Sequence, residues 1–192
     1  MPELSASTTF IEATVDDASS AHPRHLHHLA AQILHNLRFQ HDWTSLRVHT
    51  HSSPTTSSSS ARTNILPRPI VSGIPPRRVY IHPDEQIELI KAGVKDEDVP
   101  PEREWILPSH LREKWTLRRF ADVFDQIEAV PPGLAEDCGA PSKSSLEMDH
   151  PDTPKDGNKW RNIKRLLLAT VDDDSTIVYY VVHNGIVKPR QN

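Results

Sequence analysis

The apolar positions near the C-terminal end of the chain predict a pair of strands. An acidic turn, Asp172-Asp173-Asp174-Ser175, separates two runs within residues 159–171 and 176–190, and these runs are apolar at nearly every position. Strands covered on both faces have this continuous pattern, whereas half-exposed strands alternate between apolar and polar residues. We therefore expect a hairpin with a cover on each side. The rest of the chain can supply one cover, and a second protein is a candidate for the other.

The remainder of the chain contains segments whose apolar residues follow a helical or an extended pattern. Six apolar residues between Leu26 and Leu37 follow helical spacing, and a second apolar stripe runs from Leu111 to Ile127. A third helix is expected to open at His82-Pro83-Asp84-Glu85-Gln86 and to stop at Gly93. Further extended segments are expected at residues 43–50, 78–81 and 104–108. The pattern predicts an α+β domain with a small, mainly antiparallel sheet flanked by helices.

Two stretches of the chain have the composition of disordered insertions. Residues 51–66 are rich in Ser and Thr and lead into the Pro-rich residues 66–69, while residues 131–158 are rich in Pro, Ser and acidic residues. Such segments bury too little apolar surface to offset chain entropy. The sequence thus predicts a disordered tail, 1–22, and one domain, 23–190, that the two insertions interrupt.

Overall composition narrows the class of protein. The 192 residues include 17 Pro, only 36% are hydrophobic, and the formal net charge of −4 argues against a uniformly basic nucleic-acid coat. The single cysteine, Cys138, cannot form an intramolecular disulfide, which fits a reducing compartment. The chain has neither the long apolar run of a membrane span nor the ordered N-terminal signal of secretion. We expect a soluble intracellular protein.

Histidines and basic residues are the remaining candidates for site chemistry. Eight of the 12 His lie between His22 and His51, but no Cys or fixed carboxylate accompanies them at metal-ligand spacing, so no metal or cofactor is expected. A basic cluster precedes the first buried strand, and a second decorates the helix after residue 111. Such clusters attract nucleic-acid phosphates, or they offset the acidic insertions and solvate exposed faces. The first cluster consists of Lys159, Arg161, Lys164 and Arg165.

The C-terminal residues carry a family resemblance. Residues 164–173 followed by Val178-Tyr179-Tyr180 resemble the last strands of the tRNA-splicing endonuclease family. Together with residues 69–71, 80–86 and 185–190, the chain is most similar to the small structural Sen subunit in its fungal form. The resemblance implies a fold like the C-terminal domain of these endonucleases. It also implies a heterotetramer in which two subunits are catalytic and two, including the small one, are not.

The family's catalytic subunits use a Tyr, a His and a Lys to cut precursor tRNA, and this set is incomplete here. Lys164 lies close to the position where the family's Lys would fall, but Tyr80 and His82 are only two residues apart. The resemblance therefore implies a non-catalytic subunit without a cofactor, which supports intron excision by pairing with a catalytic subunit. Two alternatives stay open. One is an active RNA endonuclease that uses Lys164 with a His from another loop, and the other is a free-standing protein-interaction adaptor.

The C-terminal hairpin is the predicted partner-binding element. Alternation along a strand places Ile177, Tyr179 and Val181 on one face, and we expect the chain's two long helices to cover only one of the two faces. Ile186 follows near an open strand edge, which invites pairing. In the family an acidic loop inserts into a basic pocket of a partner, and the resemblance implies this role for Asp172, Asp173 and Asp174. A solvated polar turn at the hairpin tip is the equal alternative.

The resemblance also sets the expected partners and location. The partners are the catalytic and structural subunits of the endonuclease, with precursor tRNA reached through the complex. A homodimer of the isolated chain is left open. The expected location is the nucleus, with the cytoplasm and an organelle surface as alternatives.

Overall fold

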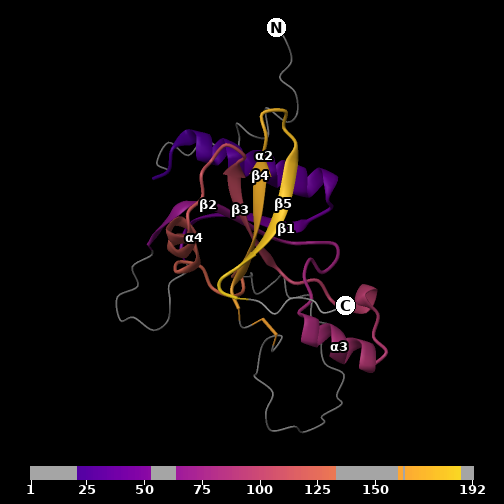
Figure 1. Ribbon diagram of the computed structural model, residues 1–192. Helices are drawn as coiled ribbons and strands as arrows, with labels where there is room; N and C mark the ends of the chain where they lie inside the picture. Colours follow the sequence, from indigo (N-terminus) through magenta and orange to yellow (C-terminus); the bar gives the residue numbers. More distant parts are fainter. Residues whose placement is uncertain (1–20, 53–63, 133–159, 162, 187–192) are drawn as a thin grey trace.

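A single open sheet organises the protein, and the α+β class predicted from the sequence is confirmed. The computed structural model describes residues 21–52, 64–132, 160–161 and 163–186. Its five strands follow the order β1-β2-β3-β4-β5, with β3 and β4 parallel and the other neighbouring pairs antiparallel (Figure 1). The strands are β1 (Thr44–His51), β2 (Ile65–Ile74), β3 (Glu104–His110), β4 (Arg165–Val171) and β5 (Ile177–His183).

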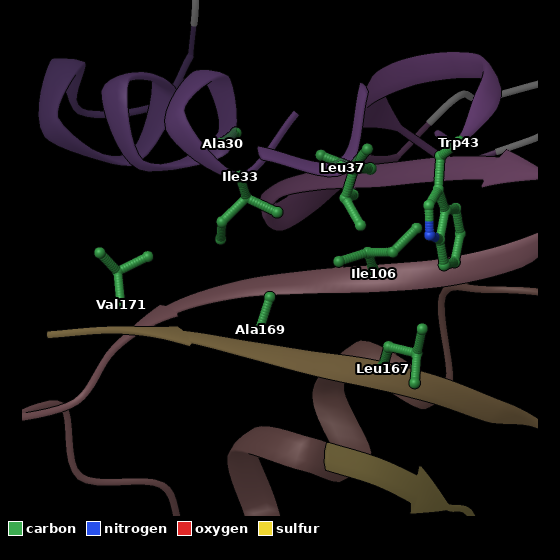
Figure 2. Packing of buried hydrophobic residues seen from close by; sticks show 9 residues of the cluster. Ala30, Ile33, Leu37, Trp43, Ile106, Leu167, Ala169 and Val171 are labelled. Carbon is green, nitrogen blue, oxygen red and sulfur yellow. The ribbon is translucent and has the colours of Figure 1, made fainter. Parts of the chain in front are cut away.

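The helix predicted at residues 26–37 lies across one face of the sheet. This helix, α2 (Arg24–Gln40), directs Ala30, Ile33 and Leu37 at the sheet, and each is almost fully buried. Figure 2 shows these side chains above apolar residues of β3 and β4. The sheet residues in this cluster are Val71, Ile106, Leu167, Ala169 and Val171. Burial of such a stripe stabilises the helix far more than its intrinsic propensity does.

The second predicted helix is shorter than expected and covers the opposite face. Helix α4 (Leu117–Phe124) begins after Thr116, whose hydroxyl accepts the backbone N–H of Arg119 at 3.3 Å. Val123, Phe124 and Ile127 pack on β2, β3 and Leu166 of β4, whereas Leu117 at the helix start is 90% exposed. The expectation that both helices cover one face was wrong. Both faces of β4 are therefore covered by this chain itself.

The Pro-rich residues 66–69, which follow the predicted insertion, lie within strand β2. In the β1–β2 ladder His49 pairs with Ile70 and His51 pairs with Ile65, so the register is irregular where Pro67 and Pro69 lie. Proline lacks a backbone N–H and is tolerated where a ladder is already interrupted. The predicted disordered segment 51–66 thus overlaps both strands at its ends, and its middle lies outside the described residues, as does nearly all of 131–158.

The segment before the third helix is held by ion pairs instead of a strand ladder. Residues 78–81, predicted to be extended, belong to no strand, and the Arg78 guanidinium pairs with Glu85 and Glu102. The helix that follows, α3 (Pro83–Lys91), begins as predicted after His82, and a short 3-10 turn, η1 (Asp96–Asp98), comes next. Gly93 adopts a φ of 71° beyond the helix end, a conformation that glycine favours. Figure 1 shows α3 to one side of the sheet.

Candidate functional site

The outer edge of β5 presents a row of main-chain groups that no described residue pairs. The β4–β5 register runs from Arg165↔His183 to Val171↔Ile177 without irregularity. At one end Asn184 N–H donates to Lys164 O at 2.8 Å, and at the other Asp172 N–H donates to Thr176 O at 2.9 Å. Hydrogen-bonded pairs alternate with non-bonded pairs along an antiparallel ladder. The even-numbered residues of β5 therefore bond to β4, and the N–H and C=O groups of Ile177, Tyr179 and Val181 face outward.

The side chains of β5 divide between the chain's own core and solvent. Ile177 and Tyr179 pack against the cluster under α2, and the Tyr179 hydroxyl donates to Asn36 Oδ1 at 2.6 Å. Burial raises the pKa of the Tyr179 hydroxyl, which keeps it neutral. Val178 and Tyr180 point to the other face and are 44% and 52% exposed. This placement corrects the expectation that Ile177 and Tyr179 offer side chains to a partner, because they face α2 and only their main chain faces the edge.

Exposed apolar residues extend along the same edge. Val181 is 40% exposed, and Ile186 just beyond the end of β5 is 98% exposed. A flat apolar edge strand without a charged side chain is prone to pairing with another strand. Of the apolar residues predicted to bind a partner, the structure therefore leaves Val181 and Ile186 available on the surface.

The opposite edge of the sheet is protected by comparison. The β1 ladder has irregularities between Thr44 and Arg47 and between His49 and His51, and Ser45 adopts a φ of 49°. Irregular register and charged residues such as Arg47 hinder pairing at an edge. Strand addition is therefore favoured at β5 over β1.

The acidic turn that joins β4 to β5 is braced within the chain. Asp173 pairs with His110 at 3.2 Å and with the Arg112 guanidinium, all on the surface. Asp174 accepts the backbone N–H of Thr176 at 2.8 Å, and this bond holds the pKa of its fully exposed carboxyl below the usual value. Asp172 accepts the backbone N–H of Asp173 at 2.7 Å. Exposed pairs of this kind add little to stability. The carboxylates of Asp172 and Asp174 bond only to the turn backbone among the described residues, so they supply the negative charge of the turn.

Two of the predicted RNA-binding residues lie in a buried ion network, which corrects that prediction. Arg161 and Arg165 are 7% and 6% exposed. Arg161 donates to Glu102 at 2.6 Å and to Glu104 at 3.1 Å, and Arg165 donates to Glu102 at 2.9 Å and to Glu104 at 2.5 Å. Both guanidinium groups are thus neutralised and screened from any phosphate in solution. The carboxylates of Glu102 and Glu104 raise the pKa of Arg165 although burial opposes them.

The other two basic residues give no phosphate site either. Lys164 donates from Nζ to the Phe124 carbonyl at 2.7 Å, on the face that α4 covers. Lys159 lies outside the described residues. Neighbours on a strand point to opposite faces, so Lys164 and Arg165 cannot serve one site.

A cluster of rings that the sequence pattern did not predict lies where β4 begins and β5 ends. Tyr80 contacts His183 with ring centroids 4.7 Å apart, and the Arg165 guanidinium lies 5.3 Å from the Tyr80 ring centre. His82 stacks on Trp160 at 5.1 Å. The register pairing of Arg165 with His183 brings this cluster together, and that pairing depends on strand order rather than on sequence spacing.

Lys164 does not share a site with Tyr80 and His183. Burial raises the pKa of Tyr80, although the nearby Arg165 opposes the shift. Burial, Arg165 and His82 lower the pKa of His183, which favours its neutral form. Lys164 occupies the other face of the sheet, bonded to Phe124. A Tyr, a His and Lys164 therefore do not converge on one bond among the described residues, as acid–base catalysis requires.

Comparison with known proteins decides the family. The Sen15 protein family matches the chain over residues 32–137 and 142–192. The chain belongs to this family. A relative from Neurospora crassa, the probable tRNA-splicing endonuclease subunit tsp-1, is 44% identical over 91% of this chain and 70% of its own length. A relative from Schizosaccharomyces pombe, the probable tRNA-splicing endonuclease subunit sen15, is 26% identical over 82% of this chain and 78% of its own length. The resemblance stated from the sequence is confirmed.

Neither a metal site nor a membrane-spanning helix is found in the part of the chain that the structure describes. No cluster of three or more His, Cys, Asp or Glu there has the arrangement of a metal site. The helices of those same residues are too short or too polar to cross a membrane. The histidines near α2 pack instead with neighbours, as His35 does against Phe39 at 4.6 Å.

Proposed function

We propose that this Sen15 family member is a non-catalytic subunit of the tRNA-splicing endonuclease that pairs with a catalytic subunit through the outer edge of β5. Membership of the family and the names of both relatives support a place in this complex. The separation of Lys164 from Tyr80 and His183 supports a role without catalysis. In this role the chain positions its partner and does not itself cut RNA.

The observation that carries the proposal is the regular, apolar and uncovered edge of β5. Its register with β4 has no irregularity, its outward N–H and C=O groups belong to consecutive odd-numbered residues, and Val181 and Tyr180 leave apolar surface in solvent. Strand addition satisfies such groups and gives affinity through main-chain hydrogen bonds. Side chains on the exposed face then contribute specificity.

The acidic turn has a supporting part in this proposal. Asp172 and Asp174 make only local contacts with the turn's own backbone, so their charge is available to a basic surface on the partner. Complementary charge sets register and partner choice more than affinity. The edge of β5 would supply the binding free energy, and the turn would align the two subunits.

Co-purification tests the proposal directly. The full chain is expressed with the catalytic subunits from the same organism. Tyr180→Asp is the edge variant, and Leu117→Asp, at a position 90% exposed at the start of α4, is the apolar-to-acid control and is expected to retain the partner. Tyr180→Asp is expected to fold, because the side chain is half exposed, and to lose the catalytic subunit. Retention of the partner by a folded Tyr180→Asp variant would remove the exposed face of β5 from the interface.

One observation favours a second candidate, an RNA endonuclease. Tyr80, His183 and a cation, Arg165, lie close together at one end of the sheet. The purified chain would then cleave an intron-containing tRNA, and His183→Ala would abolish the cleavage. An inactive wild-type chain would leave the non-catalytic proposal in place.

A further inference from the structure

Helix α3 carries an apolar surface that the described residues leave in solvent. Ile87 and Ile90 are one turn apart on this helix and are 49% and 66% exposed. Val94 follows the helix end, where its backbone N–H folds back to donate to Leu89 O at 2.9 Å, and it is 37% exposed. Isolated exposed apolar residues are common, whereas several on one short segment favour a contact surface.

Polar contacts hold α3 in place, so its apolar residues are left for another contact. Figure 1 shows the helix beside the sheet and not across either face of it. Among the nine residues of α3, all of which the structure describes, Glu85 is the one buried, and it pairs with the Arg78 guanidinium at 2.6 Å. His82, which caps the helix, stacks on Trp160 at 5.1 Å. Neither of these contacts uses the apolar surface of the helix.

The surroundings of this apolar surface are acidic. From the start of α3 to the end of η1, residues 83–98 contain six acidic residues and two lysines, a net charge of −4. The Arg78 guanidinium, which pairs with Glu85, reduces this charge to −3. Glu97 and Asp98 of η1 are exposed. A segment that combines apolar with basic residues is therefore complementary to the surface of α3.

The chain itself has a segment of that composition just after β5. Residues 186–190 read Ile-Val-Lys-Pro-Arg, and those after Ile186 lie outside the described residues. Strand β5 ends close to the start of α3, because the ring of its last residue, His183, lies 4.7 Å from the ring of Tyr80, three residues before the helix. Residues 184–190 span about 23–25 Å when extended, whereas the whole of α3 is about 14 Å long. The segment is therefore long enough to reach Ile90.

We propose that residues 186–190 bind along α3, so that their two apolar residues cover Ile87 and Ile90 and their two basic residues lie beside the acidic residues of α3 and η1. The contact covers Ile186, which is otherwise 98% exposed, and it ties α3 to the end of β5 through apolar packing. Because the contact forms within one chain, it does not depend on subunit pairing. The main chain of Val181 stays available for pairing at the β5 edge.

Nuclear magnetic resonance of the full chain tests this contact. The methyl groups of isoleucine and valine are labelled with ¹³C, and nuclear Overhauser cross-peaks between them are recorded. Cross-peaks from the Val187 methyl groups to Ile87 or Ile90 are expected, because such peaks require methyl groups in close contact. Their absence would overturn the proposal. A mixture of differently labelled chains identifies contacts between two molecules, and cross-peaks that arise only between chains would assign the surface to a second copy and overturn the proposal as well.

A variant of α3 and a matched control separate this contact from the general effect of removing an exposed isoleucine. Ile90→Ser is expected to fold, because the side chain is 66% exposed, and to abolish the cross-peaks between Val187 and Ile87. Ile65→Ser removes an isoleucine of similar exposure, 53%, at the start of β2 and is expected to leave these cross-peaks unchanged. Equal effects of the two substitutions would contradict the assignment.

Charge reversal tests the role of the basic residues in the segment. The double variant Lys188→Glu with Arg190→Glu places two acids beside an acidic surface, so the ratio of bound to free segment is expected to fall by roughly two- to tenfold. The cross-peaks would weaken accordingly. Lys114→Glu with Arg118→Glu reverses two exposed charges at α4 and is expected to leave the cross-peaks unchanged. Cross-peaks of parental intensity in the first double variant would contradict binding through charge complementarity.

Discussion

Substitution of Val181 by proline isolates the main-chain contribution of the β5 edge. Val181 stands opposite Leu167 in a non-bonded pair, so its N–H faces away from β4. Proline removes this N–H and places a ring at the edge without breaking a β4–β5 hydrogen bond. The side chain is 40% exposed, so little packing is lost. Val181→Pro is therefore expected to fold and to lose the ability to accept a partner strand.

The size of the effect follows from the group left without a partner. A strand added at this edge would have one carbonyl that faces the proline ring and is buried without a donor, which costs about 1–3 kcal/mol. Since about 1.4 kcal/mol is tenfold in affinity, we expect binding to weaken by roughly tenfold or more. The ring also occupies the space of the added strand, which increases the loss.

Isothermal titration of the purified chain with the catalytic subunit measures this loss. Val181→Ala shortens the same side chain but keeps the N–H, so it is expected to bind within a few-fold of the parent. Val182→Pro removes a hydrogen bond to β4, because Val182 pairs with Leu166 in the bonded register, and it is expected to reduce the melting temperature instead. Circular dichroism confirms which variants fold. A folded Val181→Pro that binds like Val181→Ala would refute strand addition at β5.

The remaining predictions concern activity, stability, acid response and location. The purified chain alone is expected not to cut an intron-containing tRNA, and intron-boundary cleavage that Lys164→Ala removes would overturn this. Arg161→Ala leaves the buried Glu104 and the partly buried Glu102 with one cation fewer, so denaturant unfolding is expected to show a loss of about 3–5 kcal/mol, whereas no loss would mean that the network is not formed. Burial, Arg103 and Arg47 lower the pKa of His49 from 6.5 to about 4. Between these pH values the unfolded chain therefore binds more protons than the folded chain, so the free energy of unfolding is expected to fall as pH decreases from about 6.5 to 4. The upper limit of this fall is about 3 kcal/mol, and the partial solvation of the ring makes the fall smaller than that limit. His49→Gln is expected to flatten this pH dependence, and an unchanged slope would assign it to other groups. The nuclear location stays a prediction, which fluorescence microscopy of the tagged full chain would check, and exclusion from the nucleus would contradict it.

The spacing of apolar residues predicted the helices and strands whose buried face is set by their own sequence. The stripe from Leu26 to Leu37 predicted α2, because one apolar face of a helix needs one cover. The continuous apolar run predicted β4 as a strand with two covered faces, which α2 and α4 supply. Periodicity does not say on which face of the sheet a helix packs, so the placement of α4 opposite α2 was missed. Strand β2 was not predicted, because its two prolines argue against a strand. They are tolerated where the β1–β2 register is irregular, and that register depends on the neighbouring strand.

The candidate sites depended on contacts between distant parts of the chain, which limited their prediction. Arg161 and Arg165 resembled a free basic cluster because their partners, Glu102 and Glu104, precede them by about 60 residues. The apolar content of the hairpin predicted an interface. The side chains of Ile177 and Tyr179, however, face the chain's own core. Strand order and register were needed to show that the main chain of these residues faces outward.

Hydrogen exchange of individual β5 amides tests the central claim most directly. In the isolated chain the amides of Val178, Tyr180 and Val182 are expected to be protected by β4, and those of Tyr179 and Val181 to exchange rapidly. Addition of the catalytic subunit is expected to protect Tyr179 and Val181 as a partner strand pairs with the edge. Rapid exchange of both amides in the assembled complex, with new protection at β1 or α3 instead, would contradict pairing through β5.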